Sequence, residues 1–142
     1  MAQTIDVIRD RIASVCASGP FHFVEAVTPL DFDLNPSQQI DQVFRITSEA
    51  GAIIGGFNYS EERTDLVSIW LARKHRADAP AAYRQLITDA SSIRAAVIRD
   101  GIQNGGDYCV PQDGSGYQVE QLDGREFLVL RLTIPVNFEA TV

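Results

Sequence analysis

The stretch Phe127–Phe138, with the sequence FLVLRLTIPVNF, decides the fold that this chain is expected to adopt. Apolar residues occupy every even-numbered position from Leu128 to Phe138, whereas Arg131 and Thr133 fall at odd positions. Side chains of a β-strand alternate between its two faces. This period of two therefore predicts a strand with one buried face and one face that is at most half covered.

A tight hairpin is expected to lead into this strand. The dipeptide Asp123–Gly124 tolerates the positive φ angles of a two-residue turn. Such a turn fixes the register of its two strands. It places Val119 opposite Leu128 and Tyr117 opposite Leu130 on the buried face.

The composition predicts one globular domain over residues 1–142. Hydrophobic residues make up 45% of the chain and charged residues 22%, which argues against disorder. The beginning, MAQTIDVIRD, has charges within its apolar run, and nowhere do 18 apolar residues follow one another. We therefore expect no signal peptide, no membrane contact and folding in the cytoplasm.

The net charge bears on nucleic-acid binding. A formal charge of −7 disfavours tight binding, because neutralising phosphates supplies most of the affinity of such proteins. It does not exclude a protein past which DNA slides.

The remaining elements follow from periodicity and turn residues. We expect a helix over residues 4–18, strands over 42–47 and 64–72, a helix over 78–100, a strand over 108–110, and then the hairpin. Residues 21–36, interrupted by two prolines, are expected to be extended or irregular. Residues 48–63, with three glycines, are expected to form a long loop, and such loops tend to be functional or disordered. This order predicts an α+β fold in two layers: an antiparallel or mixed sheet with two helices packed on one face.

Two motifs suggest ligands but fail in detail. Asp31, Asp33 and Asn35 resemble the start of a calcium loop, yet its sixth position is Pro36 and its twelfth is Gln42. The glycines of residues 51–56 are not followed by the Lys-Ser or Lys-Thr of a phosphate-binding loop. We expect neither a metal nor a cofactor.

Catalytic chemistry is also not expected. Cys16 and Cys109 with His22 and His75 are the candidates for a nucleophile and its base, but helical spacing puts Cys16 against the core. A buried apolar thiol is unreactive. No GxSxG or HExxH motif occurs. The chain is therefore expected not to be an enzyme.

Two groups of residues are candidates for protein contacts. Apolar residues in the long loop and the C-terminal tail go beyond what a small sheet needs, and uncovered they would form an association surface. The expected subunit or partner contacts are Phe57, Tyr59, Glu61, Glu62, Arg63, Val136, Phe138 and Val142. The basic cluster at Arg73, Lys74 and Arg76 is either a solvated turn or an electrostatic contact with an acidic partner or passing DNA.

The order and size of these segments resemble the tail terminator proteins of long-tailed bacteriophages and related phage-like particles. The shared features are a leading helix, a PLDF-type stretch, strands near VFRI and LVSIWLAR, a second long helix and a closing hairpin. The ending RLTIPVNFEA matches the family's closing pattern R-L-x-L-x-V-x-Y/F-E at Arg131, Leu132, Ile134, Val136, Phe138 and Glu139.

The resemblance implies a structural role. Six copies would form a ring on the last ring of the tail tube, stop polymerisation and offer a docking face to the head connector, with DNA passing through the lumen. Assembly would take place in the host cytoplasm. Two other classes remain open: a head-closure or minor tail protein, and a small-molecule-binding module or enzyme.

Overall fold

A computed structural model describes residues 4–25, 42–57, 60–74, 79–103, 105–111, 115–121 and 127–141. The helices are α1 (Ile5–Ala17) and α2 (Ala79–Ile102). The strands are β1 (Val24–Glu25), β2 (Gln42–Phe57), β3 (Ser60–Lys74), β4 (Tyr108–Cys109), β5 (Gly116–Gln121) and β6 (Phe127–Thr141).

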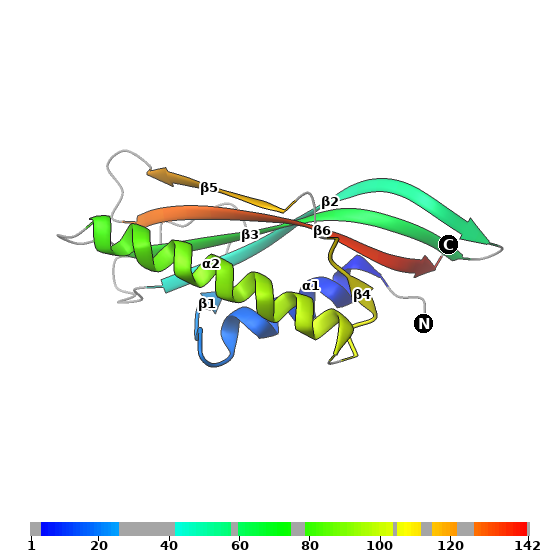
Figure 1. The fold of residues 1–142 in the computed structure, drawn as a ribbon, viewed down its shortest axis with the longest axis horizontal. Helices are drawn as coiled ribbons and strands as arrows, with labels where there is room; N and C mark the ends of the chain where they lie inside the picture. Colours follow the sequence, from blue (N-terminus) through cyan, green and yellow to red (C-terminus); the bar gives the residue numbers. More distant parts are fainter. Residues whose placement is uncertain are drawn as a thin grey trace.

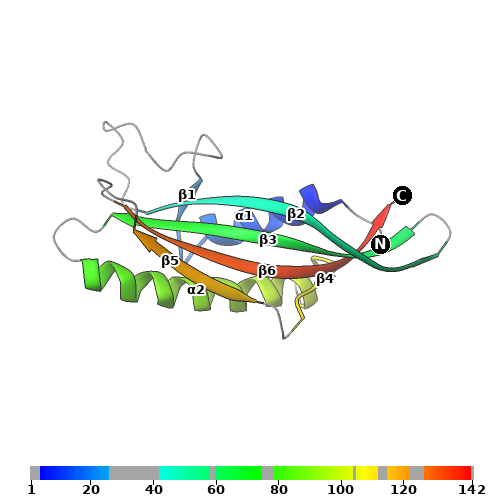
Figure 2. The ribbon, with the colours of Figure 1, turned by 90° about the horizontal axis from the view of Figure 1, so that it is seen from above.

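These strands form one mixed sheet. Its order is β1-β2-β3-β6-β4, and β5 also pairs with β6. β1 runs parallel to β2, while the other pairs are antiparallel. Both helices lie against the same face of the sheet (Figures 1 and 2). The predicted α+β fold, with a sheet and two helices, is confirmed.

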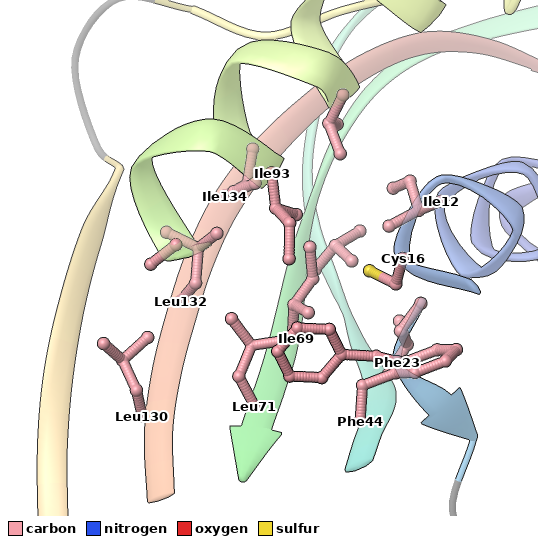
Figure 3. Close-up of a cluster of buried hydrophobic side chains, with 14 of the residues drawn as sticks. Ile12, Cys16, Phe23, Phe44, Ile69, Leu71, Ile93, Leu130, Leu132 and Ile134 are labelled. Atoms are coloured by element: carbon pink, nitrogen blue, oxygen red, sulfur yellow. The ribbon is translucent and has the colours of Figure 1, made fainter. Parts of the chain in front are cut away.

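The core lies between the helices and this covered face. Leu130, Leu132, Ile134 and Val136 are almost completely buried, as the alternation in β6 predicted. They align across the sheet with core residues of β3, which align in turn with β2; for example, Leu130 pairs with Leu71 and Leu71 with Phe44. Figure 3 shows Ile134 of β6 beside Ile93 of α2, with Ile12 and Cys16 of α1 on the other side of the cluster. The helices contribute Ile8, Ile12, Cys16, Leu86, Ala90, Ile93 and Val97.

The predicted hairpin register is wrong by two residues. Val119 pairs with Leu130 and Tyr117 with Leu132, and the last pair is Gln121 with Leu128. This register does not centre on Asp123 and Gly124, which lie outside the described residues. A shift by an even number leaves each residue on its predicted face. Tyr117 is nevertheless 54% exposed, so its predicted burial is also wrong.

The long loop expected over residues 48–63 is a second hairpin. β2 pairs with β3 up to Phe57 and Ser60. Register shifts occur in β2 between Glu49 and Ala52 and between Ile53 and Gly55. Each such bulge adds a residue to one strand and interrupts its alternation of faces. The period of two was therefore hidden in the sequence, although the strand continues.

The segment expected to be irregular contains a short strand. Val24 and Glu25 of β1 pair with Val43 and Phe44 of β2, and Phe23 is buried in the core. Residues 26–41, which include the calcium-like motif at 31–35, lie outside the described part of the chain.

Candidate functional site: a projecting hairpin arm

The far ends of β2 and β3 extend past both helices (Figures 1 and 2). The end of β6 runs beside them, with Ser60 of β3 paired to Thr141. We call residues 51–57, 60–64 and 137–141 the arm. A projecting three-stranded ribbon offers backbone edges and side chains that the core of this chain does not use.

A buried carboxylate holds the base of the arm. Asp65 is 2% exposed, and its Oδ1 accepts hydrogen bonds from the Gly51 backbone amide at 3.0 Å and from Arg63 Nη2 at 3.3 Å. The Thr64 hydroxyl donates to Asn137 Oδ1 at 2.6 Å, which ties β3 to β6. Arg63 Nε, beside the first bulge, is buried without a hydrogen-bond partner among the described residues. The contacts of Asp65 and Thr64 hold the base of the arm within one chain.

An exposed apolar residue lies on this arm that sequence reasoning missed. Ile53 is 63% exposed, and Leu66, just beyond the arm, is 38% exposed. The signal in the sequence is the run of apolar residues and glycines at 50–56, whose missing alternation is typical of a loop. Recognised as a hairpin strand, the same run would have brought Ile53 into consideration.

The predicted contact residues differ in exposure. Glu62 is exposed, while Glu61 and Arg63 are partly exposed. Val136 and Phe138 are 0% and 6% exposed, so their prediction as association residues is wrong. They continue the covered face of β6. Phe138 also pairs with Tyr108 of β4.

The other predicted contacts are only partly described. Phe57 ends β2 and pairs with Ser60, but its side chain lies outside the described part. Tyr59 and Val142 also lie outside it.

The predicted basic cluster at Arg73, Lys74 and Arg76 is also only partly described. Arg73 Nε donates to Asp89 Oδ2 at 2.7 Å, and its guanidinium lies 5.3 Å from the centre of the Phe23 ring. Arg73 thus joins β3 to α2 within the chain. Lys74 ends β3, and residues 75–78, including Arg76, lie outside the described residues.

A hollow of about 530 Å³ lies beside the base of the arm. Its lining includes Ile102, Tyr108, Cys109, Phe138 and Glu139, from α2, β4 and β6. It therefore has an apolar floor, an exposed thiol and three carboxylates, those of Glu62, Asp107 and Glu139. Such a hollow can receive an apolar side chain from a neighbouring molecule.

An ion-paired network supports that floor. Arg11 Nη2 donates to Asp100 Oδ1 at 2.8 Å and Arg11 Nε donates to Asp100 Oδ2 at 3.1 Å. The Tyr108 hydroxyl lies 2.9 Å from both Asp100 Oδ2 and the Val97 carbonyl, and donates to one of them at a time. Burial, together with this carboxylate, raises the pKa of Tyr108. The network fixes β4 against α2.

The two cysteines differ in environment. Cys16 is buried, as its helical position predicted, and burial raises the pKa of its thiol to about 12. This group is poorly suited to act as a nucleophile near neutral pH. Cys109 is exposed. His22 is exposed, and His75 lies outside the described residues.

Within the described ranges, no group of three or more His, Cys, Asp and Glu side chains is placed to hold a metal ion. Among the helices of the described chain, none combines the length and apolar character needed to cross a membrane. No protein-family model matches the sequence, and no curated protein matches it either.

Proposed function

We propose that this chain is a structural protein of a long-tailed bacteriophage or phage-like particle and forms a ring, most simply a hexamer, at the top of the tail tube. The ring stops tube polymerisation and presents a surface for the head connector. The observation that carries the proposal is the arm. Asp65 holds the base of the arm, and the arm exposes the side chain of Ile53.

The order of elements supports the proposal. The resemblance implies a leading helix, strands, a second long helix and a closing strand, and α1, β2, β3, α2 and β6 follow in that order. Small α+β domains with this order are not restricted to one role. The arm is the further reason to propose that this chain binds other protein subunits and does not catalyse a reaction.

The charge of the molecule also supports the proposal. The formal charge is −7, and Glu49, Glu62 and Glu139 are exposed on or next to the arm. An acidic lumen repels DNA phosphates and does not hold DNA in transit. DNA is thus expected to pass through the ring without a stable complex.

A capping assay tests the proposal. Tubes would be grown from the tail tube protein of the same particle, with and without this protein, and their lengths and ends recorded by negative-stain electron microscopy. We expect tube growth to stop, with a ring visible at the end of each capped tube. An unchanged length distribution would contradict the proposal.

Variants connect the assay to the arm. Ile53→Asp puts a charge at the exposed apolar position and should abolish capping while leaving the fold intact. Tyr83→Asp is the matched control, because Tyr83 is 48% exposed on α2. Capping by Ile53→Asp at normal efficiency would remove the arm from the mechanism.

The same preparation separates the alternatives. A head-closure connector would form rings that bind the portal side and leave tube growth unchanged. A small-molecule-binding module or enzyme would remain without symmetric assembly both alone and with tubes, and the hollow beside the arm would be the place to seek its ligand.

A further inference from the structure

A single cross-strand row runs through the base of the arm. Ile53 of β2 pairs with Arg63 of β3, Arg63 pairs with Phe138 of β6, and Phe138 pairs with Tyr108 of β4. Side chains that are paired directly in this way project from the same face of a sheet. The row therefore joins the exposed apolar residue of the arm to the floor of the hollow beside it.

The two ends of this row lie on opposite sides of the sheet. Ile53 is at the β2 edge, where β1 pairs only with Val43 and Phe44 and no other described strand pairs. The hollow is on the side of β6 and β4, and Ile53 is not part of its lining. Three strand spacings separate β2 from β4 by about 14 Å. Ile53 is therefore too far away to fill the hollow of its own copy.

Both ends expose apolar surface that this chain does not cover. Ile53 is 63% exposed, and Ile102, in the wall of the hollow at the end of α2, is exposed to the same extent. Phe138 and Tyr108 form the floor. Removing such side chains from water favours their contact. The two ends are therefore suited to each other, but only between two copies of the chain.

The acidic rim decides which surface of a second copy fits the hollow. The hollow has three carboxylates, those of Glu62, Asp107 and Glu139. Two hollows placed against each other would bring all of these like charges together, which disfavours that contact. Ile53 is uncharged, and its partner in the row is the Arg63 guanidinium, which is 29% exposed and bonded to Asp65. Glu61, which pairs with Gly56, lies nearer the tip of the hairpin. The Ile53 end therefore suits the hollow better than a second hollow does.

We propose that Ile53 of one copy inserts into the hollow of a second copy, against Ile102 and Phe138. The contact is heterologous, because it uses a different surface on each partner. Each added copy leaves an unused Ile53 at one end of the assembly and an unused hollow at the other. Such contacts continue from copy to copy until the rotation between copies closes a ring.

This contact would join the subunits of the ring described above, so the inference rests on the proposed function. One inserted side chain and its surroundings make a small interface, whereas stable complexes bury roughly 1,200–2,000 Å². The free protein is therefore expected to associate weakly. The end of a tube holds several copies side by side and favours completion of the ring. A covalent trap detects the contact in both situations.

The chain already carries one half of such a trap. Cys109 is exposed and lines the hollow, whereas Cys16 is buried. Ile53→Cys adds a thiol at the opposite end of the row. A disulfide requires Cα atoms within about 7 Å, so thiols on β2 and β4 of one copy, about 14 Å apart, cannot form one. Oxidation, or a short bismaleimide, should therefore give dimers, trimers and higher species on a non-reducing gel.

Two control variants test whether the linkage requires both ends. Ile53→Cys combined with Cys109→Ser removes the thiol of the hollow, and its products should stop at a dimer. Tyr83→Cys retains Cys109 and places the new thiol at a residue of α2 that is 48% exposed. Its linkage arises from chance collision and should be at least about tenfold slower. Circular dichroism and the thermal midpoint would show that each variant is folded.

A third variant tests the hollow without removing a thiol. Ile102→Glu, introduced together with Ile53→Cys, adds a fourth carboxylate to the wall of the hollow. Because Ile102 is exposed, the change should leave the fold intact. The rate at which the higher species form should fall at least about tenfold, since the apolar contact is lost.

The outcomes separate this contact from the capping function. Linkage of Ile53→Cys no faster than that of Tyr83→Cys, with and without tubes, would overturn the inference. A rate unchanged by Ile102→Glu, or linkage that needs no Cys109, would do the same. Higher species without capping by the native chain would support the contact and contradict the cap. Capping by the native chain without linkage would support the cap and overturn the contact.

Discussion

At the scale of single residues, Cys16 shows how burial controls a titratable group. Its thiol ionises only near pH 12 in the folded chain, against an ordinary value of 9.0, because burial penalises the thiolate. Above pH 9 the unfolded chain therefore loses this proton first. The contribution of Cys16 to stability is complete below that pH and declines as the pH rises towards 12.

We predict that Cys16→Ala weakens the alkaline loss of stability. The measurement is urea unfolding of both proteins at pH values on either side of 9.0, the ordinary pKa of the thiol. Tyr108 ionises late in both proteins, so its effect cancels in the comparison. Equal declines would contradict the assignment of Cys16 as a group buried in its neutral form.

Asp100 is a buried carboxylate whose loss should destabilise the chain. It accepts two hydrogen bonds from Arg11 and lies 2.9 Å from the Tyr108 hydroxyl. Asp100→Ala should lower the free energy of unfolding by about 1.5–3 kcal/mol, the usual worth of hydrogen bonds to charged groups. Chemical denaturation measures the change.

Asp10→Ala is the control for this substitution. Asp10 is paired with Arg9, but its side chain is 78% exposed. Exposed pairs contribute little, so the change should stay within about 0.5 kcal/mol. A similar loss in both variants would show that the network beneath β4 contributes no more than a surface ion pair.

At the scale of elements, the bulge in β2 accounts for the glycine at position 51. A Cβ built there would lie 1.7 Å from the Thr64 carbonyl oxygen, so the neighbouring strand leaves no room for a side chain. The first bulge thus depends on a close approach of two backbones. Gly51 is therefore needed for the close approach of two strands and does not indicate a loop.

Gly51→Ala is predicted to destabilise the chain by about 1–3 kcal/mol, as overpacking usually does. Gly116→Ala is the matched control, because a Cβ at Gly116 meets no atom within 4 Å. Thermal unfolding of the two variants gives the comparison. Equal midpoints would mean that the arm does not hold the close approach of β2 and β3 in solution.

The hairpin of β5 and β6 shows the limit of turn rules. The alternation in β6 correctly predicted its buried face, because that pattern is internal to one strand. The register was wrong because it depends on where the turn is centred, and the observed pairs do not centre on Asp123 and Gly124. The dipeptide Asp123–Gly124 permits a tight turn at this position but does not require the turn to be centred there.

At the scale of the whole molecule, stability should be unevenly distributed. β6 pairs with both β3 and β5 beside the helices, whereas β2 in the arm pairs on one side only among the described strands. Backbone hydrogen bonds at an exposed edge open more readily than those in a core.

We predict that amides at 130–132 exchange with deuterium at least about ten times more slowly than those at 53–57. Mass spectrometry of peptic fragments would measure the rates. Similar protection in both segments in dilute protein would show that the arm belongs to the same cooperative unit as the core. Protection of the arm that appears only at high concentration would indicate a contact between copies there.

The sequence by itself determined the α+β class, the existence of both helices and the buried face of the central strand. Each of these follows from a pattern within one continuous segment: a period of two in β6, and helical spacing of apolar residues in α1 and α2. Backbone geometry converts such a period directly into a face. These conclusions therefore needed no knowledge of the neighbouring segments.

Only the tertiary structure decided which surfaces remain open. It turned the expected loop into an arm, buried Val136 and Phe138, and engaged Arg73 with Asp89. It also aligned Arg45, Trp70 and Arg131, which lie far apart in the chain. Bulges and connection lengths set these neighbours, because a shift of one residue between strands changes every cross-strand partner. That information belongs to the assembled sheet and to no single segment.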